Sequence, residues 1–273
     1  MPDALFTDAH CHPFNLAQCF PAAEDERRQL GVMCAASATT MEEFTYCEQL
    51  SREADAAPPL LPCFAVHPQM PQAMSADEQL AALETLAAQG RLAAVGETGF
   101  DLYNAAFRET EKIQDALFAA HLEAALRHGL PLVIHVRRAM HKIFIHAALL
   151  KKCRAVIFHS WPGTAGEGDA LLRRGINAFF SFGSVIRLNH REAMRCCAVF
   201  PADRLLTETD APFQPPRGKQ FSGYADLGPI LETMTALRRE AGTEDVSAEE
   251  MKKIVEKNFY AAFNEEFFTT EGE

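Results

Sequence analysis

The sequence predicts an α/β protein of the TIM-type (β/α)8 barrel class, formed by a single domain over residues 1–273. Eight short apolar segments alternate with segments of helical period, which is the pattern of a parallel barrel. The chain length is typical of one such barrel, and 48% of the residues are hydrophobic, which suits one large core. No repeat, low-complexity tract or linker divides the sequence, so we expect one domain.

The eight apolar segments have the length and bounding residues of β-strands. Each is followed by a polar or helical stretch, so a strand and a helix alternate along the chain. In order, the expected strands are Leu5–Ala9, Gly31–Ser37, Leu60–Val66, Leu92–Glu97, Leu130–Val136, Ala155–His159, Ile176–Phe182 and Arg204–Glu208.

The clearest helix lies between the fourth and fifth strands. Ile113, Leu117, Ala120 and Ala124 recur at steps of three and four residues, and Gly129 follows as a typical helix-terminating residue. The remaining helices are expected at Ala76–Gln89, Met140–Leu150, Glu167–Arg174, Arg191–Val199, Leu227–Ala241 and Ser247–Phe263.

Polar residues with metal-binding side chains stand at or just past the ends of five of these strands. In a parallel barrel the carboxyl ends of the strands meet on one face, and chemistry is found there. Imidazole and carboxylate groups are the ligands that suit zinc, manganese and similar ions. The side-chain types and their positions at strand ends together predict a metal site made of His10, His12, Glu97, His135, His159 and Asp210.

Each of these residues also has a purely structural interpretation. A histidine can be a buried, hydrogen-bonded core residue, Glu97 can cap a helix or form a salt bridge, and Asp210 can be a turn residue before Pro212. His10 and His12 are two residues apart, so in a strand they share a face and Cys11 points away. A doubly wound open sheet would show the same alternation but would separate the first and last strands, so the metal site favours a closed barrel.

These motifs together resemble the TatD family of metal-dependent hydrolases, within the amidohydrolase-like group of metal-binding barrels. The resemblance extends over nearly the whole chain and follows the order of the family's motifs. The matching stretches are DAHCH at 8–12, FAVHP at 64–68, AVGETGFD at 94–101, LPLVIHVR at 130–137, VIFHSWPG at 156–163, and LLTETDAPF with PRGK between 205 and 219.

The resemblance implies two divalent metal ions per chain, of which Mg²⁺, Mn²⁺ and Zn²⁺ are candidates. One ion would be held by His10, His12 and Asp210, and the other by His135 and His159, with Glu97 bridging the two. A metal-activated water would be the nucleophile, because two neighbouring cations lower the pKa of water and clamp the attacking and leaving oxygens.

Three carboxylates are candidates for catalysis. Asp210 is the candidate base, and Glu97 bridges the ions. Glu208 lies two residues before Asp210 and can orient a ligand or the substrate, or can be a buried partner of a lysine or arginine. Asp101 either orients a metal-bound histidine or caps a helix.

The expected substrate-binding residues depend on weaker signals. His67 can contact a phosphate oxygen or support a ligand, and Arg137, Arg217 and Lys219 stand where a phosphate would approach, although such charges are often simply solvated. Trp161 departs from the family pattern and can either stack on a base or sugar or narrow the pocket.

The family implies a phosphodiesterase acting on DNA, of the 3′ exonuclease or deoxyribonuclease type. The alternative with the same metals is an acyl hydrolase, either a small-molecule amidase, esterase or lactonase or a D-aminoacyl-tRNA deacylase. A third alternative is a metal-stabilised scaffold without activity, although structural zinc sites usually close with four ligands around one ion. Converging cations around the site would favour phosphates, and an enclosed apolar pocket would favour an acyl substrate.

The net charge of −11 disfavours a high-affinity DNA-binding protein, but it does not disfavour an enzyme that turns nucleic acid over as a substrate. The sequence has neither a signal peptide nor an apolar run long enough for a membrane helix, so we expect a cytoplasmic protein without a membrane partner. No protein partner is inferred. Eight cysteines without a C-x-x-C pair are expected to be reduced thiols.

Overall fold

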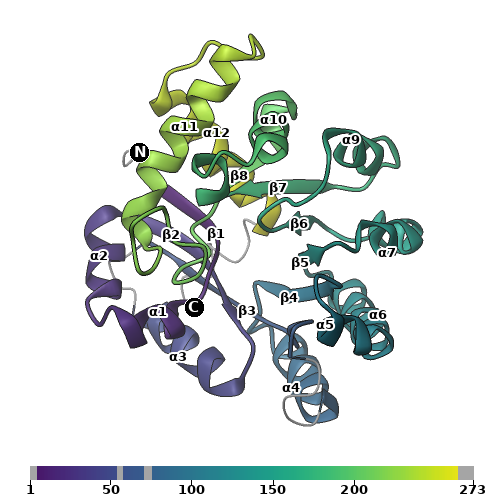
Figure 1. Cartoon of the computed structure of the whole chain (residues 1–273). Helices are drawn as coiled ribbons and strands as arrows, with labels where there is room; N and C mark the ends of the chain where they lie inside the picture. Colours follow the sequence, from purple (N-terminus) through teal and green to yellow (C-terminus); the bar gives the residue numbers. More distant parts are fainter. Residues whose placement is uncertain (1–4, 54–57, 71–75, 264–273) are drawn as a thin grey trace.

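The computed structural model describes residues 5–53, 58–70 and 76–263. Its centre is one sheet of eight parallel strands in the order β1 to β8, and helices surround the strands on the outside (Figure 1). The structure therefore confirms the predicted (β/α)8 barrel. The strands are β1 Phe6–Cys11, β2 Val32–Ala38, β3 Leu60–Phe64, β4 Ala94–Asp101, β5 Leu132–Arg137, β6 Val156–Phe158, β7 Ala178–Phe182 and β8 Leu205–Thr207.

The first and last strands are joined by hydrogen bonds at the carboxyl end of the barrel. The Asp210 backbone N–H donates to the His10 carbonyl at 2.9 Å. The buried Asp8 carboxylate accepts from the Thr209 backbone N–H at 2.9 Å and from its hydroxyl at 2.6 Å. These bonds place two predicted metal ligands, from opposite ends of the chain, next to each other, as a closed barrel requires and an open sheet does not allow.

The barrel interior is apolar at the amino ends of the strands. Helix α12, Ala248–Phe263, closes this end with Phe259 and Phe263, and its Asn258 amide donates to the Leu205 carbonyl at 2.8 Å. Because the amino end is filled, polar side chains facing inward gather at the opposite end. The strand side chains that pack with Phe259 and Phe263 in this apolar interior include Ala9, Met33, Ala35, Leu61, Cys63, Val133, Ile157, Phe179 and Leu206.

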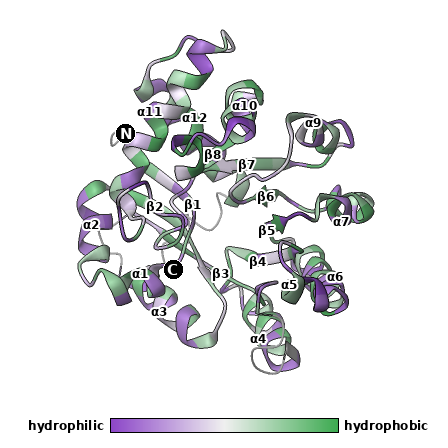
Figure 2. Ribbon diagram, viewed as in Figure 1, coloured by the Kyte–Doolittle hydropathy of each residue, from purple (hydrophilic) through white to green (hydrophobic). Residues whose placement is uncertain are grey.

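The outer helices turn their apolar sides toward the strands and their polar sides outward (Figure 2). The predicted helices are present, except that the segment Met140–Leu150 forms two short helices. The helices are α1 Pro13–Cys19, α2 Ala23–Leu30, α3 Met41–Arg52, α4 Ala76–Ala88, α5 Ala105–Glu109, α6 Glu111–His128, α7 Met140–Ile145, α8 Ala147–Leu150, α9 Ala165–Arg173, α10 Arg191–Val199, α11 Leu227–Glu240 and α12, with 3-10 turns η1 Ser184–Arg187, η2 Ala202–Arg204 and η3 Tyr224–Asp226.

The sequence analysis missed α1, α2, α3 and α5. A signal for α3 was present, because Thr40 and Glu43 form a reciprocal capping box at its start. None of the helices in the described part of the chain has the length and apolar character needed to cross a membrane.

Two glycines determine the path of β4 beside β5. A Cβ at Gly96 would lie 2.5 Å from the Val133 Cβ, and a Cβ at Gly99, where φ is +139°, would lie 1.9 Å from the His135 carbonyl oxygen. The pairing register between these strands shifts between Val95 and Thr98. Glu97 consequently lies within β4, three residues after its start, whereas the sequence placed it at the strand end.

Candidate metal centre

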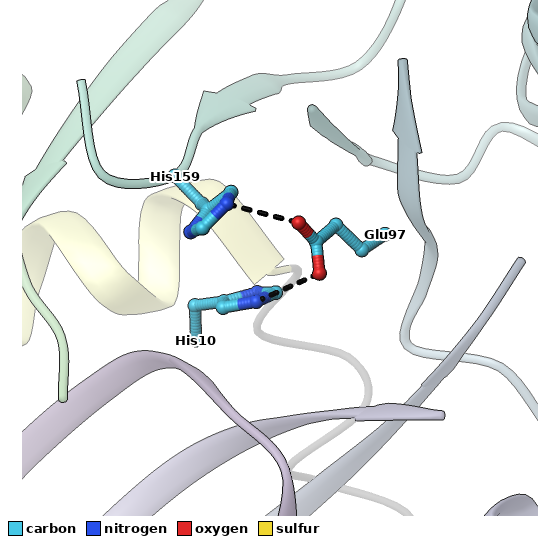
Figure 3. Close-up of side chains that lie close together, drawn as sticks. All are labelled: His10, Glu97 and His159. Carbon is cyan, nitrogen blue, oxygen red and sulfur yellow. Dashed lines mark ion pairs between the residues drawn. The ribbon is translucent and has the colours of Figure 1, made fainter. Parts of the chain in front are cut away.

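The Glu97 carboxylate is the centre of the polar cluster at the carboxyl end of the barrel. It is 2% exposed, and imidazoles from four strands or the loops after them surround it. Figure 3 shows it between His10 and His159, with an ion pair to each. The nitrogen–oxygen distances to Glu97 are 2.8 Å for His135, 2.9 Å for His159, 3.0 Å for His67, 3.1 Å for His10 and 3.6 Å for His12.

Asp210 supplies the second carboxylate of the cluster. Its Oδ1 lies 3.4 Å from His12 Nε2 and 3.6 Å from His10 Nε2, and its Oδ2 accepts a hydrogen bond from the Gln214 amide at 2.7 Å. The six predicted ligands therefore lie in one connected group, although they come from positions 10 to 210 of the sequence.

In this cluster, burial and the charges of neighbouring side chains shift the pKa values in opposite directions. Burial raises the pKa of Glu97, but His67, His159 and His10 outweigh it and hold that pKa well below the ordinary value. Burial lowers the pKa of His159, but Glu97 and Glu208 outweigh it and raise that pKa well above the ordinary value. The buried carboxylates thus favour the protonated form of the His159 imidazole.

The pKa values of His10 and His67 are lowered, whereas those of His12, His135 and His159 are raised. Burial lowers the pKa of both side chains, more than the Glu97 charge raises it. His12 has its pKa raised, because Asp210 and Glu97 together outweigh the effect of burial. Neutral imidazole is the form that binds a metal ion, so His10 is poised to coordinate without losing a proton.

The donor set fits divalent cations. Three groups of side chains have ligand atoms within 4.8 Å of one another, and His10 Nε2 and His159 Nδ1 are buried without a hydrogen-bond partner. Imidazole and carboxylate donors of this kind suit zinc, manganese and related ions. The three groups are His10–His12–Asp210, His10–Glu97–His159 and His67–Glu97–His135.

One of these groups, His10–His12–Asp210, is a ligand set that the family resemblance implied, and the implied set of Glu97, His135 and His159 is divided between the other two groups. The third adds His67, which the sequence analysis considered only as a substrate or supporting residue. His67 follows β3, and its Nε2 lies as near to Glu97 as the predicted ligands do, at 3.0 Å. The FAVHP motif was therefore a signal for a site residue, but its spacing alone did not distinguish a ligand from a substrate contact.

Two polar side chains contact the outer nitrogens of the histidine rings. Ser37 Oγ lies 3.1 Å from His10 Nδ1, and Asp101 Oδ2 lies 3.1 Å from His135 Nε2. Such contacts fix the ring orientation and the tautomer of a metal-binding histidine. Asp101 thus has the first of its two predicted roles, orientation of a histidine.

Glu208 is fully buried beneath the site. Its Oε2 accepts a hydrogen bond from the Ser181 hydroxyl and lies 3.7 Å from His159 Nδ1. It does not line the cavity, and its described partners include neither a lysine nor an arginine. The placement favours orientation of His159 over direct contact with a substrate.

A cavity of about 720 Å³ opens over the metal-binding groups. His12, His67, Glu97, His135, His159 and Asp210 contribute to its lining. Arg137 and Arg191 line the same cavity, as do the half-exposed side chains of Met70 and Phe213. The Phe213 ring contacts His12 edge to face, with centroids 5.1 Å apart.

The predicted substrate residues are only partly brought together. His67 and Arg137 line the cavity, but Arg217 and Lys219 do not. Lys219 Nζ instead forms an ion pair with Asp226 at 2.6 Å, because the loop after β8 turns back toward η3. The expectation that Arg217 and Lys219 converge on this cavity is corrected accordingly.

Trp161 lines the cavity with little exposed surface. Its indole is 1% exposed and packs edge-on against Phe158, Phe180 and Phe200. A ring packed in this way offers no open face for a base or sugar. Of the two roles predicted for Trp161, narrowing the pocket agrees with its placement.

Arg191, Phe213 and Met70 are cavity residues that the sequence analysis did not select. Phe213 lies within the LLTETDAPF stretch, so a signal for it existed. Arg191 is the first residue of α10, and Met70 lies in the loop after β3, so neither carries a local pattern that points to the cavity.

A (β/α)8 barrel with histidines and carboxylates gathered at the carboxyl ends of its strands defines the class of metal-dependent barrel hydrolases. Comparison with known proteins identifies the family: residues 7–264 match the family described as TatD related DNase, and the chain belongs to it.

Relatives of this chain carry both general and specific names. It is 30% identical to an uncharacterized metal-dependent hydrolase TatD of Mycobacterium tuberculosis, over 77% of this chain and 80% of that protein. It is 29% identical to the uncharacterized metal-dependent hydrolase YcfH of Escherichia coli K12, over 95% and 96%. A 3′-5′ ssDNA/RNA exonuclease TatD of Erwinia tasmaniensis is 34% identical over 56% of this chain and 58% of that protein.

Solved structures agree with the family assignment. YJJV, a TatD homologue from E. coli K12, matches with a TM-score of 0.81 and 26% identity, over 95% of this chain and 98% of that one. A TatD family hydrolase from Entamoeba histolytica matches with a TM-score of 0.74 at 16% identity, over 97% and 99%, and supports the fold alone.

Proposed function

We propose that this protein is a two-metal phosphodiesterase that removes nucleotides from the ends of single-stranded DNA. The single observation that carries the proposal is the lining of the cavity, where metal-binding groups and the arginines Arg137 and Arg191 occur together. Within the described residues, neither arginine has a carboxylate within ion-pair distance. Unpaired guanidinium groups beside a metal centre suit a phosphodiester, and a neutral acyl substrate gives them no partner.

The relatives add support from a second direction. A protein named 3′-5′ ssDNA/RNA exonuclease shares 34% identity with this chain over 153 residues. The net charge of −11 disfavours tight binding of long DNA, and it is compatible with an enzyme that holds a strand end and releases the product.

When bound, divalent cations would neutralise phosphate charge and lower the pKa of a water molecule. His10, His12 and Asp210 would hold one cation, Glu97 would contact both, and His135 and His159 would hold the other, with His67 beside Glu97 as a further donor. The chain itself then binds and orients the phosphate through Arg137 and Arg191.

Asp210 is the residue we assign to proton acceptance. Its pKa is lowered despite burial, because His12, His159 and His10 surround it, so the carboxylate is held in its ionised form. Gln214 donates to Asp210 Oδ2 at 2.7 Å and holds the carboxylate in place, while Oδ1 faces the histidines.

A substrate screen tests the proposal. The purified protein, loaded in turn with Mg²⁺, Mn²⁺ or Zn²⁺, is offered end-labelled single-stranded DNA and, separately, aryl esters, lactones and an aminoacyl-tRNA. We expect release of mononucleotides from DNA and loss of this activity in Asp210→Asn. Hydrolysis of acyl substrates with intact DNA under every metal would replace the proposal by the acyl-hydrolase alternative, and no hydrolysis at all would favour the scaffold.

A further inference from the structure

Tyr103 stands at the rim of the barrel as a half-exposed aromatic residue surrounded by arginines. The Arg137 guanidinium carbon lies 3.6 Å from the centre of its ring, and that of Arg138 lies 4.5 Å away. Arg138 also donates a hydrogen bond to the Tyr103 carbonyl at 3.3 Å. A third arginine, Arg108, donates to the Leu102 carbonyl at 3.3 Å.

These arginines are free of carboxylate partners among the described residues, in a protein of net charge −11. Some arginines elsewhere on the surface are paired, such as Arg91 with Glu48 at 2.6 Å and Arg127 with Glu84 at 2.6 Å. Positive charge is therefore concentrated, without compensation, around one aromatic ring at the carboxyl face. A guanidinium over an aromatic ring can also offer its outer plane to a nucleobase and its N–H edges to phosphate.

The cluster is continuous with the metal centre through two strands. Tyr103 follows Asp101 by two residues at the end of β4, and Arg137 follows His135 by two residues at the end of β5. Asp101 and His135 are in contact at 3.1 Å, and Arg137 lines the cavity. A strand whose scissile phosphate lies at the metal centre would thus meet Tyr103 and Arg138 as it leaves the cavity.

We infer that Tyr103, Arg137 and Arg138 form a binding subsite for the nucleotides of a single strand beyond the scissile bond. The inference rests on the proposed function and specifies its substrate as an oligonucleotide, longer than a dinucleotide. Bases stack on the aromatic–guanidinium layer, and the backbone phosphates pair with the arginine edges.

Substrate length provides the test. KM is measured for a dithymidylate and an octathymidylate with wild type, Tyr103→Leu, Tyr103→Phe and Arg138→Gln. In wild type we expect the longer substrate to have a KM about tenfold lower, which is the scale of one base–aromatic contact. Tyr103→Leu and Arg138→Gln should bring the ratio of the two KM values close to one, and Tyr103→Phe should retain it.

The structure offers a matched control for Arg138. Arg174 lies 4.9 Å from the Phe144 ring centre, donates to the Ala170 carbonyl at 3.2 Å and has no described carboxylate partner. It is the C-cap residue of α9 and does not line the cavity. Arg174→Gln should leave the length dependence at the wild-type value. An equal effect of Arg174→Gln, or no length dependence in wild type, overturns the inference.

A binding measurement distinguishes a failure of this inference from a failure of the proposed function. Fluorescence anisotropy of a labelled octathymidylate is measured with the same variants in Ca²⁺ as well as in Mn²⁺. If wild type binds the octamer more tightly than the dimer, and Arg138→Gln loses this preference, the subsite holds even where no hydrolysis is detected. If hydrolysis occurs without any length preference in binding, the proposed function survives and the subsite does not.

Discussion

Asp101 Oδ2 lies 3.1 Å from His135 Nε2, on the opposite side of the imidazole from the Glu97 carboxylate, which lies 2.8 Å from Nδ1. The ring is therefore held between two carboxylates. Asp101 is itself fixed by the Gln69 amide at 2.8 Å and the Tyr103 backbone N–H at 2.8 Å. This geometry assigns Asp101 to the orientation of His135.

Replacing Asp101 by asparagine should weaken metal binding without unfolding the protein. The amide keeps the shape and an acceptor oxygen but loses the charge that strengthens His135 as a donor, so we expect a loss of about 10- to 100-fold in affinity for Mn²⁺. Isothermal titration calorimetry with Mn²⁺ measures the affinity of wild type and of Asp101→Asn. Equal affinities would show that Asp101 has no part in holding His135.

The close approach of β4 and β5 predicts unequal effects of two alanine substitutions. Gly99→Ala should destabilise the fold by about 3 kcal/mol or more, because a Cβ there meets the His135 carbonyl and φ is positive. Gly90→Ala is the control, with φ of +66° and open space, and should cost about 1 kcal/mol. Denaturant unfolding compares the two, and similar losses would contradict the stated cause.

We expect the buried His121 side chain to make the fold less stable at acid pH. It is fully buried, its Nδ1 lies 2.6 Å from Thr98 Oγ1, and its Nε2 accepts from the Val66 N–H at 3.2 Å. Burial lowers its pKa to about 3, so the folded protein keeps this ring neutral while the unfolded chain protonates it below about pH 6.5. The unfolded state then binds more protons, and stability is lost as pH falls from about 6.5 toward 3.

Between pH 7.5 and pH 5, this single group should remove about 2 kcal/mol from the free energy of unfolding. His121→Gln lacks the titration and should lose correspondingly less over the same range. Urea unfolding at the two pH values measures both proteins. A difference between the two proteins that does not change with pH would mean that the fold does not lower the pKa of His121.

Metal addition should stabilise the protein, and more so at higher pH. His159 and His135 have their pKa values raised by the carboxylates around them, although burial opposes the rise, so protons compete with metal at these nitrogens. Free Mn²⁺ at about 100 times its Kd should stabilise the fold by about 2.7 kcal/mol per site. Thermal unfolding at pH 6 and pH 8, with and without chelator, should show the larger metal-dependent rise at pH 8; a larger rise at pH 6 would contradict proton competition.

The sequence predicted the barrel because its strands are apolar and its helices periodic. It also predicted six of the residues in the metal-binding groups, because strand ends in a parallel barrel converge on one face. The short helices α1 and α2 were missed, since tertiary packing, not periodicity, maintains them. The positions of His67 and Phe213 depend on the paths of the loops after β3 and β8, and that of Arg191 depends on where α10 begins over the cavity. Lys219 pairs with Asp226, a residue outside the strand motifs.

The central claim is that the six predicted ligands hold two divalent cations, with Glu97 between the two cations. The most direct measurement is the number of Mn²⁺ ions bound per chain at saturation, determined by titration and elemental analysis for wild type and for His159→Ala. We expect two ions in wild type and one in the variant, since His10, His12 and Asp210 remain intact. A wild-type protein that binds one ion or none would contradict the claim.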